Sequence, residues 1–174
     1  MKKKKPKSTT LHRWTAEELQ ERFAKENQQR AACFNRLIGH YKQTLEDPNL
    51  GDFKRKFAES LVEYARGSMY REGIIDEVPE YLLKCDKELA FANGGRNRRL
   101  CLQRNLWRLE AEEQVAVDMF FFQTQGNLTN IAEKLGVERA RAREIFFSGL
   151  EKICEIDPRA MSHRTLRDLL RLAD

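Results

Sequence analysis

Residues 126–153 read GNLTNIAEKLGVERARAREIFFSGLEKI. Apolar residues recur here at helical spacing, first around Ile131 and then from Ala142 to Ile153, on either side of Gly136. Glycine adopts the left-handed backbone conformation at low cost, so Gly136 is suited to end one helix and turn the chain into the next. The stretch therefore predicts two helices joined by a tight turn.

A further helix is expected just before this pair, over residues 112–124, with Val115, Met119 and Phe122 on one side. We expect Thr129 to cap the next helix. The small Ala132 allows two helices to cross closely, and Val137 can fill the corner between them. The three helices together predict a helix-turn-helix module, in which the N-terminal residues of the last helix meet base edges and phosphates.

Arginines alternate at the start of that last helix, where each side chain offers a positive charge and a bidentate hydrogen-bonding fork. The alternative interpretation is a solvated face, offset by neighbouring glutamates. The position directly after the turn favours nucleic acid, so we expect duplex DNA as the partner. The candidate DNA-binding residues are Thr129, Asn130, Glu138, Arg139, Arg141 and Arg143.

Residues 109–153, LEAEEQVAVDMFFFQTQGNLTNIAEKLGVERARAREIFFSGLEKI, resemble the fourth conserved region of bacterial sigma factors. The portion GNLTNIAEKLGV is also similar to the DNA-binding ends of Fis-type regulators. The resemblance implies that the last helix contacts a promoter element through Arg139, Ala140, Arg141 and Arg143, and it makes RNA polymerase a second expected partner. No segment matches the second region of a sigma factor, which favours a regulator with a sigma-like module over a complete sigma factor.

The remainder of the chain also reads as helical. Thr15 and Glu18 predict a capping box at the start of a long helix that ends before Pro48. We expect Asp52 to cap a second helix with an apolar stripe, a third helix to run from Pro79 to the NGG stretch at 93–95, and further helices over residues 100–109 and 162–173. No segment alternates long enough for a strand, so the predicted class is all-α, with a bundle-like N-terminal half and a C-terminal helix-turn-helix module.

The glycine pair at 94 and 95 is the expected boundary between two halves. The predicted domains are a disordered basic arm over residues 1–13, a helical domain over 14–94 for dimerisation or partner docking, and a DNA-binding domain over 95–174. We expect the last of these to fold on its own. The arm's lysines are interpreted either as phosphate contacts or as a solubilising tail.

The net charge of +5 is carried by that arm, since Lys2, Lys3, Lys4, Lys5 and Lys7 account for all of it. The rest of the chain is neutral, so an anion-binding surface must arise from local segregation. One segregated run lies between Gly95 and Leu109. It indicates either phosphate or partner contact or an ordinary amphipathic helix, and its candidate residues are Arg96, Arg98, Arg99 and Arg104.

Several classes of function are not expected. The four cysteines and three histidines are scattered without zinc spacing, which predicts no metal site, and no cofactor motif or catalytic constellation is apparent. No apolar run is long enough to span a membrane. We expect a cytoplasmic, nucleoid-associated protein, or a nuclear one in a eukaryote, and the small basic form favours a phage or mobile element as the source.

These observations predict a sequence-specific DNA-binding transcriptional regulator that is not an enzyme. The alternative is an accessory protein for RNA polymerase, antitermination or DNA packaging that contacts DNA weakly. A homodimer is a further expected partnership for the N-terminal helices.

Overall fold

The structure is a computed structural model that describes residues 11–123 and 126–161. The described residues form helices and no strand, which confirms the all-α class. The predicted helix over 162–173, the end of the helix predicted to reach residue 124, and residues 1–10 of the predicted arm lie outside the described residues.

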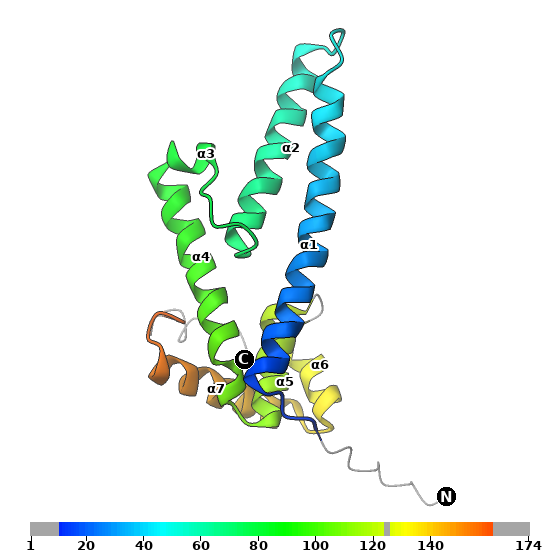
Figure 1. Ribbon diagram of the computed structural model, residues 1–174. Coiled ribbons are helices and arrows are strands. Elements are labelled where there is room, and N and C mark those ends of the chain that lie inside the picture. The colour runs from blue at the N-terminus through cyan, green and yellow to red at the C-terminus, as the bar shows by residue number, and fades with distance from the viewer. Residues whose placement is uncertain (1–10, 124–125, 162–174) are drawn as a thin grey trace, which may run out of the picture.

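Two long antiparallel helices, α1 (Ala16–Leu45) and α2 (Asp52–Arg71), form a hairpin that projects from a base of shorter helices (Figure 1). The base contains α5 (Ala111–Phe122), α6 (Leu128–Leu135) and α7 (Arg139–Ile156). A second arm, α4 (Asp86–Asn105), rises beside the hairpin, with the single-turn α3 (Glu80–Leu83) at its upper end and the 3-10 turn η1 (Leu106–Arg108) at its foot.

The long first helix begins and ends where the sequence predicts. The Thr15 side chain accepts from the backbone N–H of Glu18, and the Glu18 carboxylate accepts from that of Thr15, which completes the capping box. The helix ends at Leu45, before Pro48. The second helix begins at Asp52, but its cap is Gly51, whose backbone is extended. Asp52 instead contributes negative charge to the first turn, where the helix dipole favours it.

The predicted helix end at the glycine pair is wrong. The chain breaks earlier, at Cys85, and α4 then runs without interruption through Gly94 and Gly95. Tertiary contacts offset the poor helix propensity of these glycines: the Tyr70 hydroxyl donates to the Asn93 side chain at 2.5 Å, and Arg96 donates to the Tyr70 carbonyl at 2.7 Å. The predicted domain boundary therefore falls inside a helix.

The main core lies in the base and includes side chains from α1. Leu19 and Phe23 are buried together with residues of α5, α6 and α7, and Trp14 packs against the same cluster. Ahead of α1, the Arg13 Nε donates to the Leu109 carbonyl at 2.9 Å. Residues 11–13, which the sequence assigns to the basic arm, are described in the structure, and this hydrogen bond holds Arg13 against the base.

The hairpin itself has little core. The apolar stripe predicted on α2 turns only partly inward: Ala65 is buried, whereas Phe53, Phe57 and Tyr64 are exposed. The face that α2 packs against α1 is one of small and medium side chains, since Ala58, Val62, Ala65 and Met69 are the buried apolar residues there. The aromatic rings lie beside that face, and within the described chain they remain open to solvent.

Candidate nucleic-acid interface

The first helix of the predicted pair, α6, is capped by Asn127 and not by Thr129 as expected. The Asn127 Oδ1 accepts from the backbone N–H of Asn130 at 2.9 Å, because an asparagine with extended backbone can satisfy a free donor of the first turn. Thr129 therefore lies inside the first turn with its side chain exposed, and Asn130 is half-buried beside it. Ile131 and Ala132 face the core.

The turn between α6 and α7 has the conformation that the sequence predicts. Gly136 has φ of 68° and ψ of 31°, in the left-handed region. The N–H of Val137 donates to the carbonyl of Ala132 at 3.1 Å and the N–H of Gly136 to that of Glu133 at 3.3 Å, the two bonds of a Schellman motif. Val137 packs against the core, as expected for a residue filling the corner.

The second helix of the pair, α7, is held against α5 by a continuous apolar face. Ala142, Ile145, Leu150 and Ile153 are all buried, which confirms the predicted inward residues. The two helices come closest at Gly149, where an added Cβ would lie 3.1 Å from Val117 and 3.2 Å from Glu113. This close contact fixes the direction in which the N-terminal turn of α7 projects.

The three arginines of α7 do not share one face. Residues two apart on a helix point about 200° away from each other, so Arg141 lies on the other side of the helix from Arg139 and Arg143. Arg139 is exposed, with Ala140 beside it. Arg143 is half-buried, because its guanidinium carbon lies 5.6 Å from the ring centroid of Phe147.

The surroundings of Arg141 are acidic. Its guanidinium donates to the Glu144 carboxylate at 2.8 Å, and both side chains are well exposed. A pocket of about 510 Å³ beside it is lined by Glu110, Glu112 and Glu113 from the start of α5. Arg139 lies outside this pocket. The positive charge of the candidate interface is therefore concentrated on the Arg139 side of α7, and Arg141 is partly neutralised.

One of those glutamates is structural. The Glu113 Oε1 accepts from Lys152 Nζ at 2.6 Å and from Ser148 Oγ at 2.8 Å, which ties α5 to α7. Burial acts to raise the pKa of Glu113, but these two hydrogen bonds and one with the backbone of Glu110 outweigh it, and the pKa lies below its ordinary value. These hydrogen bonds therefore favour the ionised form of Glu113, which lines the pocket.

The arginines of the basic run on α4 make different contacts from one another. Arg96 ties α4 to α2 by donating to the Tyr70 carbonyl, and to the segment after α2 by donating to the Ile75 carbonyl and the Asp76 carboxylate. Arg99 lies over the ring of Phe122, at 4.9 Å from its centroid, and burial together with the nearby Arg30 lowers its pKa. Arg98 is half-buried and Arg104 is exposed.

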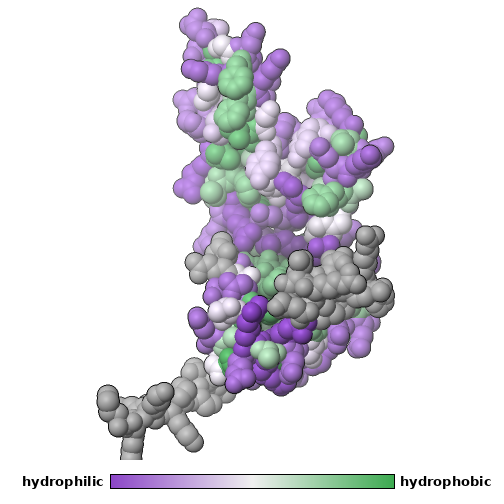
Figure 2. All heavy atoms as spheres, turned by 180° about the vertical axis from the view of Figure 1, so that it is seen from behind, coloured by the Kyte–Doolittle hydropathy of each residue, from purple (hydrophilic) through white to green (hydrophobic). Residues whose placement is uncertain are grey.

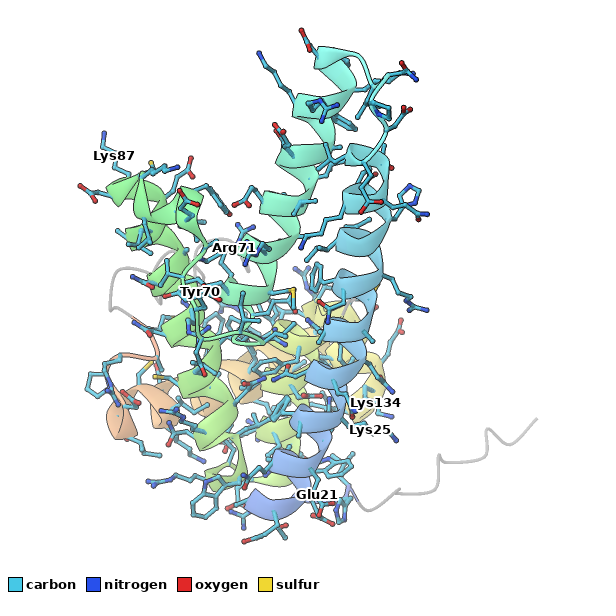
Figure 3. The ribbon with its side chains drawn as sticks, turned by 45° about the horizontal axis from the view of Figure 1, so that its top comes forward. Glu21, Lys25, Tyr70, Arg71, Lys87 and Lys134 are labelled. Atoms are coloured by element: carbon cyan, nitrogen blue, oxygen red, sulfur yellow. The ribbon has the colours of Figure 1, made fainter. Side chains whose placement is uncertain are left out.

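Two lysines outside the predicted set of DNA-binding residues project from the same side of the base, Lys25 of α1 and Lys134 of α6 (Figure 3). Lys134 is exposed in the last turn of α6 and lines a pocket of about 470 Å³ together with Arg22 of α1. Only the packing of α1 onto the base brings these cations near α6. In the sequence, the only indication that Lys134 contributes to the interface is its place in the last turn of the helix before Gly136.

Within residues 11–123 and 126–161, no group of three or more histidine, cysteine, aspartate or glutamate side chains is arranged to hold a metal ion. None of the helices described there is long and apolar enough to cross a membrane. Comparison with protein-family models, with curated proteins and with solved structures finds no match.

Proposed function

We propose that the protein is a sequence-specific DNA-binding transcriptional regulator that uses α6 and α7 as a helix-turn-helix. The observation that supports this most is the turn itself. The left-handed Gly136, the Schellman hydrogen bonds and the partly buried Val137 are what a tight connection between two crossing helices requires. The exposed N-terminal turn of α7 follows immediately.

In this proposal α7 enters the major groove with its first turn, and Arg139 makes the base contact. Arg139 is exposed and lies away from the acidic pocket, so its fork is available to a guanine edge. Arg143 is steadied by the Phe147 ring and contacts a phosphate at the flank. Thr129 and Asn130, in the first turn of α6, contact the sugar-phosphate backbone of the DNA. Lys134 and Lys25, on the same side of the base, contact it too.

Arg141 and Glu138 have weaker roles in this scheme. Arg141 must break its ion pair with Glu144 to reach a phosphate. Exchanging one exposed ion pair for another contributes little to the free energy of binding. Glu138 sits at the cap position of α7 without a side-chain cap hydrogen bond, so its carboxylate is available to accept from a cytosine amino group.

A second candidate function is favoured by the acidic pocket beside Arg141 and by the exposed aromatic residues of the hairpin. Both features suit a protein surface better than a phosphate backbone. In this alternative the protein is an accessory factor that binds RNA polymerase, or an antitermination or packaging complex, and touches DNA weakly.

The test is selection from a pool of random duplex DNA, followed by affinity measurements at rising salt. The regulator hypothesis predicts enrichment of one motif and an affinity that falls steeply with salt concentration, because phosphate contacts release counterions. Recovery of unenriched DNA at all salt concentrations, together with salt-insensitive binding of RNA polymerase, would reject it in favour of the accessory factor.

A further inference from the structure

The outer face of α2 carries three exposed aromatic residues that the described part of the chain leaves uncovered. Phe53, Phe57 and Tyr64 are 82%, 56% and 62% exposed, and the rings of Phe53 and Phe57 stack with their centroids 6.5 Å apart. Viewed from behind, the hairpin shows this apolar stripe running along its length, with a second apolar area over the α3 and α4 arm (Figure 2). Phe91 of α4 is 76% exposed.

A groove lies at the lower end of this stripe, between α2 and the α4 arm. It has a volume of about 360 Å³, and its lining includes Tyr64 and Arg71 of α2 and Tyr81, Lys87 and Phe91 of the α3 and α4 arm. Arg71 on α2 and Lys87 on α4 stand on its two sides (Figure 3). The Arg71 guanidinium lies over the Tyr64 ring at 5.8 Å, which leaves a cation at the mouth of an apolar groove.

We propose that a second copy of this chain covers the stripe, with the two α2 helices packed antiparallel about a two-fold axis between Ser60 and Leu61. The spacing along α2 fits this arrangement. At 1.5 Å per residue, Phe53 lies about 11 Å from the axis on one side, and the middle of the segment from Tyr64 to Arg71 lies about 11 Å away on the other. The Phe53 ring of each copy therefore reaches the groove of its partner.

The other residues of the stripe are complementary under the same operation. Phe57 of each copy falls beside Tyr64 of the other, and Ser60, a small residue, sits at the axis where the two backbones are closest. The charges agree: Lys56 of one copy lies near Glu63 of the other, whereas a parallel pairing would bring the lysines at 54 and 56 of both copies to the same level of the interface. The stripe is thus self-complementary in one orientation only.

The exposed aromatic area supplies most of what a stable dimer requires. With about 200 Å² for each aromatic side chain, the exposed parts of Phe53, Phe57, Tyr64 and Phe91 amount to roughly 550 Å² per copy. That is the larger part of the ~800 Å² that each partner contributes to a standard interface. Exposed apolar area on this scale often marks an interaction site.

This inference does not depend on the proposed function, but it has a consequence for it. The hairpin projects away from α5, α6 and α7 (Figure 1), so the antiparallel dimer places the two bases at opposite ends. Such a dimer would hold two separate DNA segments and would not read two adjacent half-sites. DNA binding and dimerisation can therefore fail independently.

The first test is the mass of the full-length protein in solution across a concentration series. We expect a species of twice 20.5 kDa, and Phe57→Ser should weaken the dimer roughly tenfold or more, as loss of a central aromatic contact does. Glu59→Ser, an exposed change on the other side of α2, is the matched control and should leave the dimer intact. A monomer at every concentration, or a Phe57→Ser protein that dimerises like the parent, overturns the proposal.

The second test fixes the orientation and does not require disrupting the interface. In a Cys33→Ser background, which removes the exposed native thiol, Ser60→Cys and Lys54→Cys are compared with a short bismaleimide crosslinker. The antiparallel dimer predicts efficient crosslinking of Ser60→Cys and none of Lys54→Cys, since the two Lys54 positions are about 20 Å apart along the axis. Equal crosslinking of both variants, or none of either, contradicts the arrangement.

Discussion

Gln114 and Trp14 are joined by two hydrogen bonds across a hundred residues of sequence. The backbone N–H of Trp14 donates to the Gln114 Oε1 at 2.8 Å, and the Gln114 Nε2 donates to the backbone carbonyl of Trp14 at 2.9 Å. Gln114 is 1% exposed. The Gln114 side chain thus satisfies both backbone groups of Trp14, and it attaches the start of α1 to α5 in the base.

The first prediction follows from this anchor. Gln114→Leu keeps the volume but leaves the N–H and carbonyl of Trp14 without partners, so we expect a loss of about 1–3 kcal/mol in the free energy of unfolding. Gln29→Leu, at an exposed position of α1, should change stability by less than about 0.5 kcal/mol. Urea unfolding of both variants measures the difference, and equal stabilities would show that the two hydrogen bonds contribute nothing.

The second prediction concerns the C-terminal half in isolation. A fragment of residues 96–174 lacks Trp14, Leu19 and Phe23, which pack into or against its core in the whole chain. We therefore expect no cooperative unfolding transition from this fragment, contrary to the expectation from sequence of a domain that folds alone. A sharp thermal transition close to that of the full chain would restore the two-domain interpretation.

The third prediction uses Glu113. Because its pKa in the folded protein lies below its ordinary value near 4.5, the carboxylate stabilises the fold above that value, and this contribution is lost as the pH falls through the lowered pKa. We expect Glu113→Gln to lower stability at neutral pH and to reduce the loss of stability in acid. Unfolding midpoints measured from neutral to acidic pH check this, and parallel curves for the two proteins would contradict it.

The fourth prediction compares two glycines. Gly136 has a positive φ, so Gly136→Ala should cost about 1–2 kcal/mol of stability. Gly94 lies within α4 with open space around its added Cβ, so Gly94→Ala should instead stabilise by about 0.5–1 kcal/mol. Thermal unfolding of both variants should shift in opposite directions. Destabilisation by Gly94→Ala would mean that α4 does not pass through this position as a regular helix.

The predictable features of the fold are those governed by neighbouring residues. The Thr15 capping box, the end of α1 before Pro48 and the left-handed Gly136 each depend on a few local side chains, and all three follow from sequence. The break at Cys85 and the continuous α4 do not. There the outcome is decided by Tyr70 and other groups of α2 that are distant in sequence, and local propensity carries no information about them.

The same limit applies to the candidate interface. The inward residues of α7 and the corner residue Val137 follow from helical periodicity. The unequal surroundings of the arginines could not be predicted, because the glutamates near Arg141 come from the start of α5 and are brought there by the packing of α5 on α7. Arg143 lies against Phe147, and helical periodicity alone does not predict this contact.

The central claim is that the first turn of α7 reads duplex DNA, and Arg139→Ala tests it most directly. The measurement is the affinity of the folded variant for the selected duplex and for a scrambled one. Arg66→Ala removes the same charge from an exposed position on α2 and serves as the control.

We predict that Arg139→Ala weakens binding to the selected duplex by about 1–3 kcal/mol, roughly five- to 150-fold, because a bidentate base contact is lost. Binding to the scrambled duplex should fall much less, and Arg66→Ala should bind both duplexes like the parent protein. If Arg139→Ala and Arg66→Ala have the same affinity for the selected duplex, α7 does not read DNA through this turn and the account is contradicted.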